Sequence, residues 1–263
     1  MRHICMTTFA ATLLSAGILL PAPVGAQNKP QGAPAQTRPA PAMPYKTLAI
    51  TPARPMQDAG LDALRKQIGE AAKKKDRAAL ARLVAGQGFF WDGQEGKGAD
   101  KKKSGGDNLT AIMGLNRKDG AGWDMLAGMA ADPTVSESAD HKGAVCAPAE
   151  PGFNDKEFDD LIAATQTDLL DWGYTLVNGA EVRATPQTGA AVVEKLGLHL
   201  VRVMPDNNPA AAVAAYIRVV TPAGKTGYVA ADAIAPLGSD QLCFVKEAGG
   251  WKIGGYIGDG DAQ

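Results

Sequence analysis

Cysteine and histidine are both scarce in this sequence, with three of each in 263 residues. Outside the first 26 residues the only cysteines are Cys146 and Cys243, and His141 is the one histidine close to either along the chain. A structural metal site needs about four such ligands in ordered spacing, and a thiol nucleophile needs a base held by a third group. Neither pattern is present, so we expect no metal site, no cofactor and no catalytic residue.

A strong excess of charge is also lacking, because 27 Lys and Arg residues stand against 28 Asp and Glu residues. Binding to duplex nucleic acid through its phosphates requires a basic face. The two basic clusters are Lys73-Lys74-Lys75 and Lys101-Lys102-Lys103, and short charge runs of this kind are typical of solvated surface. We therefore expect no nucleic-acid partner.

Long hydrophobic runs are lacking, with one exception near the N-terminus. Arg2 precedes an apolar stretch from residue 6 to residue 20, and a small-x-small site, Val24-Gly25-Ala26, follows a pair of prolines. This order predicts a signal peptide over residues 1–26 that is cleaved after Ala26, so that the mature chain begins at Gln27. The apolar stretch is shorter than the roughly 20 residues of a membrane-spanning helix. We expect a periplasmic or secreted protein without an integral membrane anchor.

The next segment, residues 27–56, contains seven prolines, spaced among Ala and Gln. Such a composition favours extended, solvated backbone rather than a packed core. We predict a disordered linker here, which either spaces the folded part from the membrane or has no role.

Residues 57–173 carry the signals of helices. Apolar residues recur at intervals of three and four from Leu61 to Ala72. The best-marked helix begins after Asn154, with Glu157 three residues on and Phe153 and Phe158 placed as a hydrophobic staple. This helix is predicted to end at Trp172-Gly173, where the glycine can adopt the left-handed conformation of a helix cap. The acidic face of this helix suits the helix dipole better than a cation site, and we predict a mainly helical domain over residues 57–173.

From Thr175 the apolar period changes to two, and short runs rich in Val, Leu, Ile and Tyr alternate with Gly, Pro and Asn. We predict an α+β protein in which a small β domain over residues 174–239 follows the helical domain. Gly249-Gly250 favours a turn between the last two strands. Residues 240–263 are therefore predicted to be a terminal β-hairpin and tail.

The β domain resembles the bacterial SH3-like (SH3b) family over residues 176–237. Val182-Arg183-Ala184-Thr185-Pro186 is similar to the family's opening motif, and Val192-Val193-Glu194-Lys195-Leu196-Gly197 is similar to its next strand and turn. Tyr216-Ile217-Arg218-Val219, followed by Gly224-Lys225-Thr226-Gly227-Tyr228-Val229, resembles its closing pair of strands. The sequence departs from the family at Glu181, at Tyr216 and in the loop from Pro205 to Ala215.

This resemblance implies a small, partly open β-barrel that binds cell-wall peptides or glycans, or other proteins, and has no chemistry of its own. Three residues are candidates for ligand binding. Tyr216 and Tyr228 offer flat faces for stacking, although in so small a barrel they could instead belong to the core. Arg183 can meet a carboxylate as a fork, or it can pair with Glu181.

A second and weaker resemblance covers residues 61–91, which are similar to the opening of NTF2-like proteins, where a helix and a turn precede a strand. No function is carried across from it.

Cys146 and Cys243 are predicted to form a disulfide, because an exported compartment permits one and neither cysteine has a catalytic or metal-binding setting. The alternative is two free thiols. The bridge would join the loop before the Asn154 helix to the strand that follows the β domain, and so would tie the terminal hairpin to the helical half.

Three functions from different classes remain. The first is an exported binding or adaptor protein that recognises peptidoglycan or an envelope protein. The second is a purely structural or stress-responsive envelope protein without a small ligand. The third is a cysteine–histidine envelope hydrolase built on Cys146 and His141, which lacks the strand-to-helix setting of such nucleophiles. The oligomeric state is not predicted.

Overall fold

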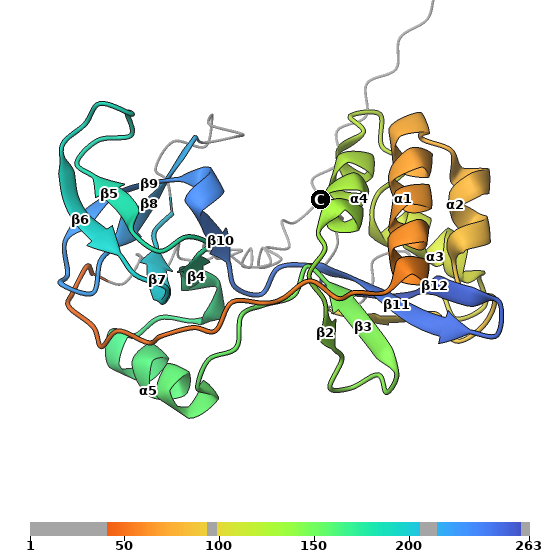
Figure 1. The fold of residues 1–263 in the computed structure, drawn as a ribbon, viewed down its shortest axis with the longest axis horizontal. Coiled ribbons are helices and arrows are strands. Elements are labelled where there is room, and N and C mark those ends of the chain that lie inside the picture. Colours follow the sequence, from red (N-terminus) through yellow and green to blue (C-terminus); the bar gives the residue numbers. More distant parts are fainter. Residues whose placement is uncertain (1–40, 94–98, 206–214, 259–263) are drawn as a thin grey trace, which may run out of the picture. The chain divides into compact units, whose positions relative to one another are not determined.

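The structure is a computed structural model, and it describes residues 41–93, 99–205 and 215–258 (Figure 1). The predicted signal peptide and the first part of the predicted linker lie outside these residues. The described chain contains five α-helices and two mostly antiparallel sheets, so the α+β class is as predicted. Among the described helices, none has the length and apolar character needed to span a membrane.

The helices, including two short 3-10 turns, are α1 (Ala59–Lys74), α2 (Arg77–Leu83), α3 (Gly105–Ile112), α4 (Ala121–Ala131), α5 (Asp155–Thr165), η1 (Leu169–Asp171) and η2 (Ala231–Ala233). The strands are β1 (Phe90–Asp92), β2 (Ser136–Glu137), β3 (Ala144–Ala147), β4 (Trp172–Thr175), β5 (Ala180–Arg183), β6 (Val192–Leu196), β7 (Leu200–Val203), β8 (Tyr216–Val220), β9 (Thr226–Ala230), β10 (Ile234–Pro236), β11 (Gln241–Glu247) and β12 (Gly250–Ile257).

Side-chain caps fix where the first helices begin. The Asp58 carboxylate accepts the backbone N–H groups of Gly60 and Leu61 at the start of α1, at 2.8 and 3.1 Å. The Ser104 hydroxyl caps α3 in the same way.

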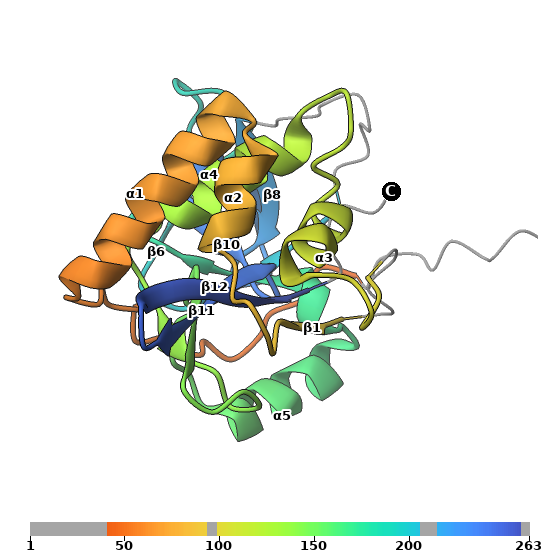
Figure 2. The ribbon, with the colours of Figure 1, turned by 90° about the vertical axis from the view of Figure 1, so that its right-hand side faces the viewer.

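One sheet carries four of the helices on one face. Its strand order is β1-β12-β11-β3-β2, with β1 parallel to β12 and the other pairs antiparallel. Figure 2 shows α1, α2 and α4 on the same side of β11 and β12. The core between them includes Leu61, Ile68 and Leu126 from the helices and Phe244 and Tyr256 from the sheet, each fully buried.

The second sheet has the strand order β10-β4-β7-β8-β9-β5-β6. One face packs around Val182, Val219 and Val229, and the other packs around Trp172 and Leu200. Within the described residues its two outer strands, β10 and β6, do not pair with each other. The sheet is therefore not a closed barrel, and only the β character of this part of the chain is as predicted.

The end of the predicted linker is ordered, which corrects the prediction of disorder for residues 41–56. This segment, the strap, buries Tyr45, Leu48 and Ile50 against the second sheet. Its backbone also pairs with the sheet, since the N–H of Leu200 donates to the carbonyl of Leu48 at 2.9 Å. Proline content predicted an extended backbone correctly, but three apolar side chains are enough to hold that backbone in place.

Two other boundaries differ from the prediction. Helix α5 ends at Thr165, with Gln166 in the left-handed conformation, so Trp172 lies in β4 rather than at a helix end. Phe158 and Leu161 of α5 pack with Trp172 in the core of the second sheet and not in the helical half. The terminal hairpin of β11 and β12 is the centre of the first sheet, as expected for a hairpin that folds back onto the helical half.

The buried hydroxyl of Tyr45 makes the stability of the folded protein depend on pH in the alkaline range. It donates to the carbonyl of Val220 at 2.8 Å, and burial raises the pKa of Tyr45 above its usual value. In the unfolded chain this tyrosine ionises near pH 10. The stability that depends on its neutral form is complete below that pH and is lost as pH rises toward the higher pKa of the folded state.

We predict that Tyr45→Phe lowers the free energy of unfolding by about 1 kcal/mol at pH 7, the value of one hydrogen bond. Above pH 10 the difference between the two proteins should shrink, because only the tyrosine can ionise. Urea unfolding at pH 7 and pH 10.5 measures both values. If the free energies of unfolding of the two proteins differ by the same amount at both pH values, the ionisation of Tyr45 does not contribute to the pH dependence of stability.

Gly122 allows α4 to approach the loop after α3. A methyl group at this position would lie 1.9 Å from the carbonyl oxygen of Met113, which is a backbone atom and cannot turn away. We predict that Gly122→Ala lowers the free energy of unfolding, measured by thermal unfolding, by about 1 to 3 kcal/mol. Gly128→Ala, in the same helix and with open space around it, should instead stabilise the protein by about 0.5 to 1 kcal/mol. Equal effects of the two changes would rule out the close approach as the cause.

Candidate functional site

The three residues that the sequence singled out lie on adjacent strands. Arg183 of β5 and Arg218 of β8 each stand directly opposite Tyr228 of β9, one on either side of it. Residues directly opposite each other in antiparallel strands project from the same face of a sheet. Tyr216 lies two residues before Arg218, so it projects from that face too. We call these four residues the Arg–Tyr face.

The reverse side of the same strands is core. Val182, Val219 and Val229 alternate with the residues of the Arg–Tyr face along these strands. Each of the three valine side chains is at most 1% exposed. Tyr216 and Tyr228 are half-buried and do not belong to the buried cluster. The alternative in which the two tyrosines serve as core of a small barrel therefore does not describe their positions here.

Neighbouring groups hold Arg183 in place. Its guanidinium lies 2.5 Å from a carboxylate oxygen of Glu181 and donates to the carbonyl of Ala190 at 2.9 Å. The pairing with Glu181 that the sequence offered as an alternative is thus present, and it orients the guanidinium rather than removing it from the face. The Tyr216 hydroxyl lies 3.1 Å from that of Thr188, which fixes the outer end of this ring.

Arg218 is the member of the face that sequence reasoning missed. Its charge is not neutralised by any ion pair with the described residues. The spacing in the sequence indicates its position, since Tyr216 and Arg218 are two positions apart in a predicted strand and therefore share a face.

The two cysteines are joined. Their sulfur atoms lie 2.03 Å apart, which is the length of a disulfide bond, and both residues are almost fully buried. Cys146 in β3 stands directly opposite Cys243 in β11. A sulfur in a disulfide is not a thiolate, so this arrangement leaves the cysteine–histidine hydrolase without its nucleophile.

His141 has a different partner from the one that a hydrolase would need. Its Nε2 atom lies 2.6 Å from a carboxylate oxygen of Asp92, and its ring stacks on Phe90 with 3.6 Å between the ring centroids. In the part of the chain that the structure describes, no group of three or more His, Cys, Asp or Glu residues could hold a metal ion. The acidic side chains of α5 are partly paired, as in the contacts of Glu157 with Lys46 and of Asp160 with Lys156.

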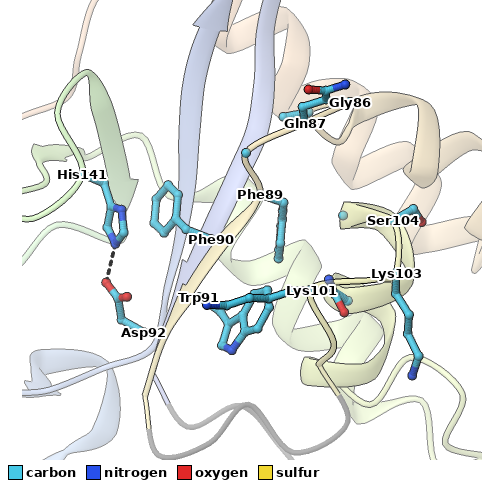
Figure 3. Close-up of a pocket in the computed structure, with 14 residues that line it drawn as sticks. Gly86, Gln87, Phe89, Phe90, Trp91, Asp92, Lys101, Lys103, Ser104 and His141 are labelled. Atoms are coloured by element: carbon cyan, nitrogen blue, oxygen red, sulfur yellow. Dashed lines mark hydrogen bonds and ion pairs between the residues drawn. The ribbon is translucent and has the colours of Figure 1, made fainter.

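A hollow lies beside β1, next to His141 and Asp92 (Figure 3). We call it the β1 pocket, and its volume is about 490 Å³. Phe89 and Trp91 lie on one side of the strand, and Phe90 and Asp92 lie on the other side with His141. Lys101, Lys103 and Ser104, in the segment just before α3, complete the wall on the side of Phe89 and Trp91. No local pattern in the sequence marked Phe89 or Trp91 as part of a site.

Comparison of this chain with protein-family models, with curated proteins and with solved structures gives no match.

Proposed function

We propose that this chain is an exported, non-enzymatic binding or adaptor protein whose SH3-like module recognises a peptide, glycan or protein of the cell envelope. The observation that carries the proposal is the Arg–Tyr face. It brings two guanidinium groups and two aromatic rings together on the outer side of three neighbouring strands.

The SH3-like assignment is supported by where the quoted motifs fall. The first ends β5, the second coincides with β6 and its following turn, and the third spans β8, a turn and β9. Short antiparallel strands around buried valines are also what a small β module of this kind needs.

The chemistry of the face favours a ligand with carboxylates and flat or ring-shaped groups. An arginine can take a carboxylate in two parallel hydrogen bonds. Tyr228, between Arg183 and Arg218, offers an amphipathic ring on which a peptide bond or a sugar ring can stack. Peptidoglycan combines both kinds of group, since its stem peptides end in carboxylates and its strands are made of sugar rings.

An extracytoplasmic location is part of the proposal. Support comes from the signal-peptide pattern of residues 1–26 and from the Cys146–Cys243 disulfide, because such bonds persist in oxidising compartments. The periplasm or the space outside the cell is where a peptidoglycan-binding protein would meet its ligand.

Co-sedimentation with isolated peptidoglycan tests the proposal. We expect the protein to pellet with the sacculi in a saturable manner, and soluble peptidoglycan fragments to release it. No binding at any salt concentration would contradict the proposal and would favour the second hypothesis, a structural protein without a small ligand. Binding that does not saturate and disappears at about 0.2 M salt would be non-specific charge attraction, and would also count against it.

A further inference from the structure

The β1 pocket is a second place where the protein could hold a ligand, and it is separate from the Arg–Tyr face in sequence and in sheet. Its volume of about 490 Å³ falls within the range of small-molecule sites. Gly86 and Gly88 contribute backbone without side chains to its lining.

The apolar wall consists of the side chains of Phe89 and Trp91, which are only partly buried. Figure 3 shows both rings on the side of β1 that faces the start of α3. The approach of α3 depends on Gly105, where a methyl group would lie 2.9 Å from the β-carbon of Phe89. Two large aromatic rings that remain accessible in a hollow are a surface for another flat group.

The opposite wall is cationic and is held in place by a buried side chain. The amide of Asn108, which is 2% exposed, accepts from the N–H of Asp100 at 2.8 Å and donates to the carbonyl of the same residue at 3.0 Å. These two bonds fasten the start of the loop that carries Lys101 and Lys103. A preorganised loop loses less entropy when a ligand binds.

The balance of charge in the pocket favours an anion. Of the described lining residues, Asp92 is the one that carries a carboxylate, and this carboxylate already has a partner in His141, whose Nε2 atom lies 2.6 Å away. Lys101 therefore sets the sign of the charge on the side of the aromatic rings.

We propose that the β1 pocket binds a small organic anion that carries a flat apolar group, with that group against Phe89 and Trp91 and the anionic group toward Lys101. This inference does not depend on peptidoglycan binding by the Arg–Tyr face. It includes no chemical step, and His141 and Asp92 serve only to hold the far side of the strand.

The probe is 2-naphthoate, and its neutral counterpart is 2-naphthamide. Calorimetric titration of the full chain should give saturable binding of the naphthoate, and at least tenfold weaker binding of the amide. The variant Lys101→Glu should weaken naphthoate binding about tenfold, because a favourable exposed charge contact is replaced by an unfavourable one. Lys101 is exposed, so this variant should fold normally.

The matched control is Lys66→Glu, which makes the same charge change at an exposed position of α1 outside the pocket. It should bind the naphthoate as the unchanged protein does. Trp91→Leu should weaken both probes, since it removes a flat surface but no charge. The proposal is overturned if the naphthoate does not bind saturably, if the amide binds equally well, or if Lys101→Glu has no larger effect than Lys66→Glu.

Discussion

Tyr228→Ala is expected to weaken binding to peptidoglycan about thirtyfold, which corresponds to a loss of about 2 kcal/mol at a central aromatic contact. The reason is the position of Tyr228 between Arg183 and Arg218, where its ring would form the floor on which the ligand stacks. The measurement is the binding isotherm from co-sedimentation with sacculi. Circular dichroism checks that the variant is folded.

A second variant separates charge from shape. Arg218→Glu should reduce binding by a similar factor, because it places a carboxylate where the ligand's own carboxylate would lie. Its control is Lys225→Glu, which makes the same charge change in the exposed turn between β8 and β9. Equal loss of binding in the two variants would mean that only net charge matters, and unchanged binding in both would remove the Arg–Tyr face as the site.

Loss of the disulfide is expected to have the largest effect on stability. Cys146 and Cys243 are 97 positions apart, and the chain-entropy model gives about 4 to 5 kcal/mol for closing a loop of that length. That is comparable to the whole stability of many domains. The double variant Cys146→Ala/Cys243→Ala should therefore unfold at much lower urea concentration than the oxidised protein, or not fold at all at 37 °C.

The control for this change is the unaltered protein after reduction. Reduced protein and the double variant should unfold at similar urea concentrations, because both lack the cross-link while keeping the β3–β11 pairing. A difference of less than 1 kcal/mol between oxidised and reduced protein would contradict the expectation. It would mean that the reduced, unfolded chain keeps enough residual structure to hold these two segments close together.

Local signals along the sequence predicted the elements well where a cap or a period marks them. Asn154 caps α5 as the pattern indicated. The shift of period near Thr175 marks the beginning of the second sheet within a few residues. The pairing of Cys146 with Cys243 could also be predicted, since a chain that is predicted to be exported and has two cysteines after residue 26 leaves one possible bridge.

What could not be predicted depends on contacts between distant residues. The strap has the composition of a linker, and its order results from Tyr45, Leu48 and Ile50 finding the far side of the second sheet. The parallel pairing of β1 with β12 joins segments more than 160 residues apart. The β1 pocket exists only because of that pairing and the approach of α3, so no local sequence pattern predicts it.

The most direct test of the central claim is to map where soluble peptidoglycan fragments bind, by the amide chemical shifts of the isotope-labelled protein. The account predicts saturable shift changes in β5, β8 and β9, around Arg183, Arg218 and Tyr228, with the first sheet unaffected. Changes confined to the first sheet, or no changes at saturating fragment concentration, would contradict it.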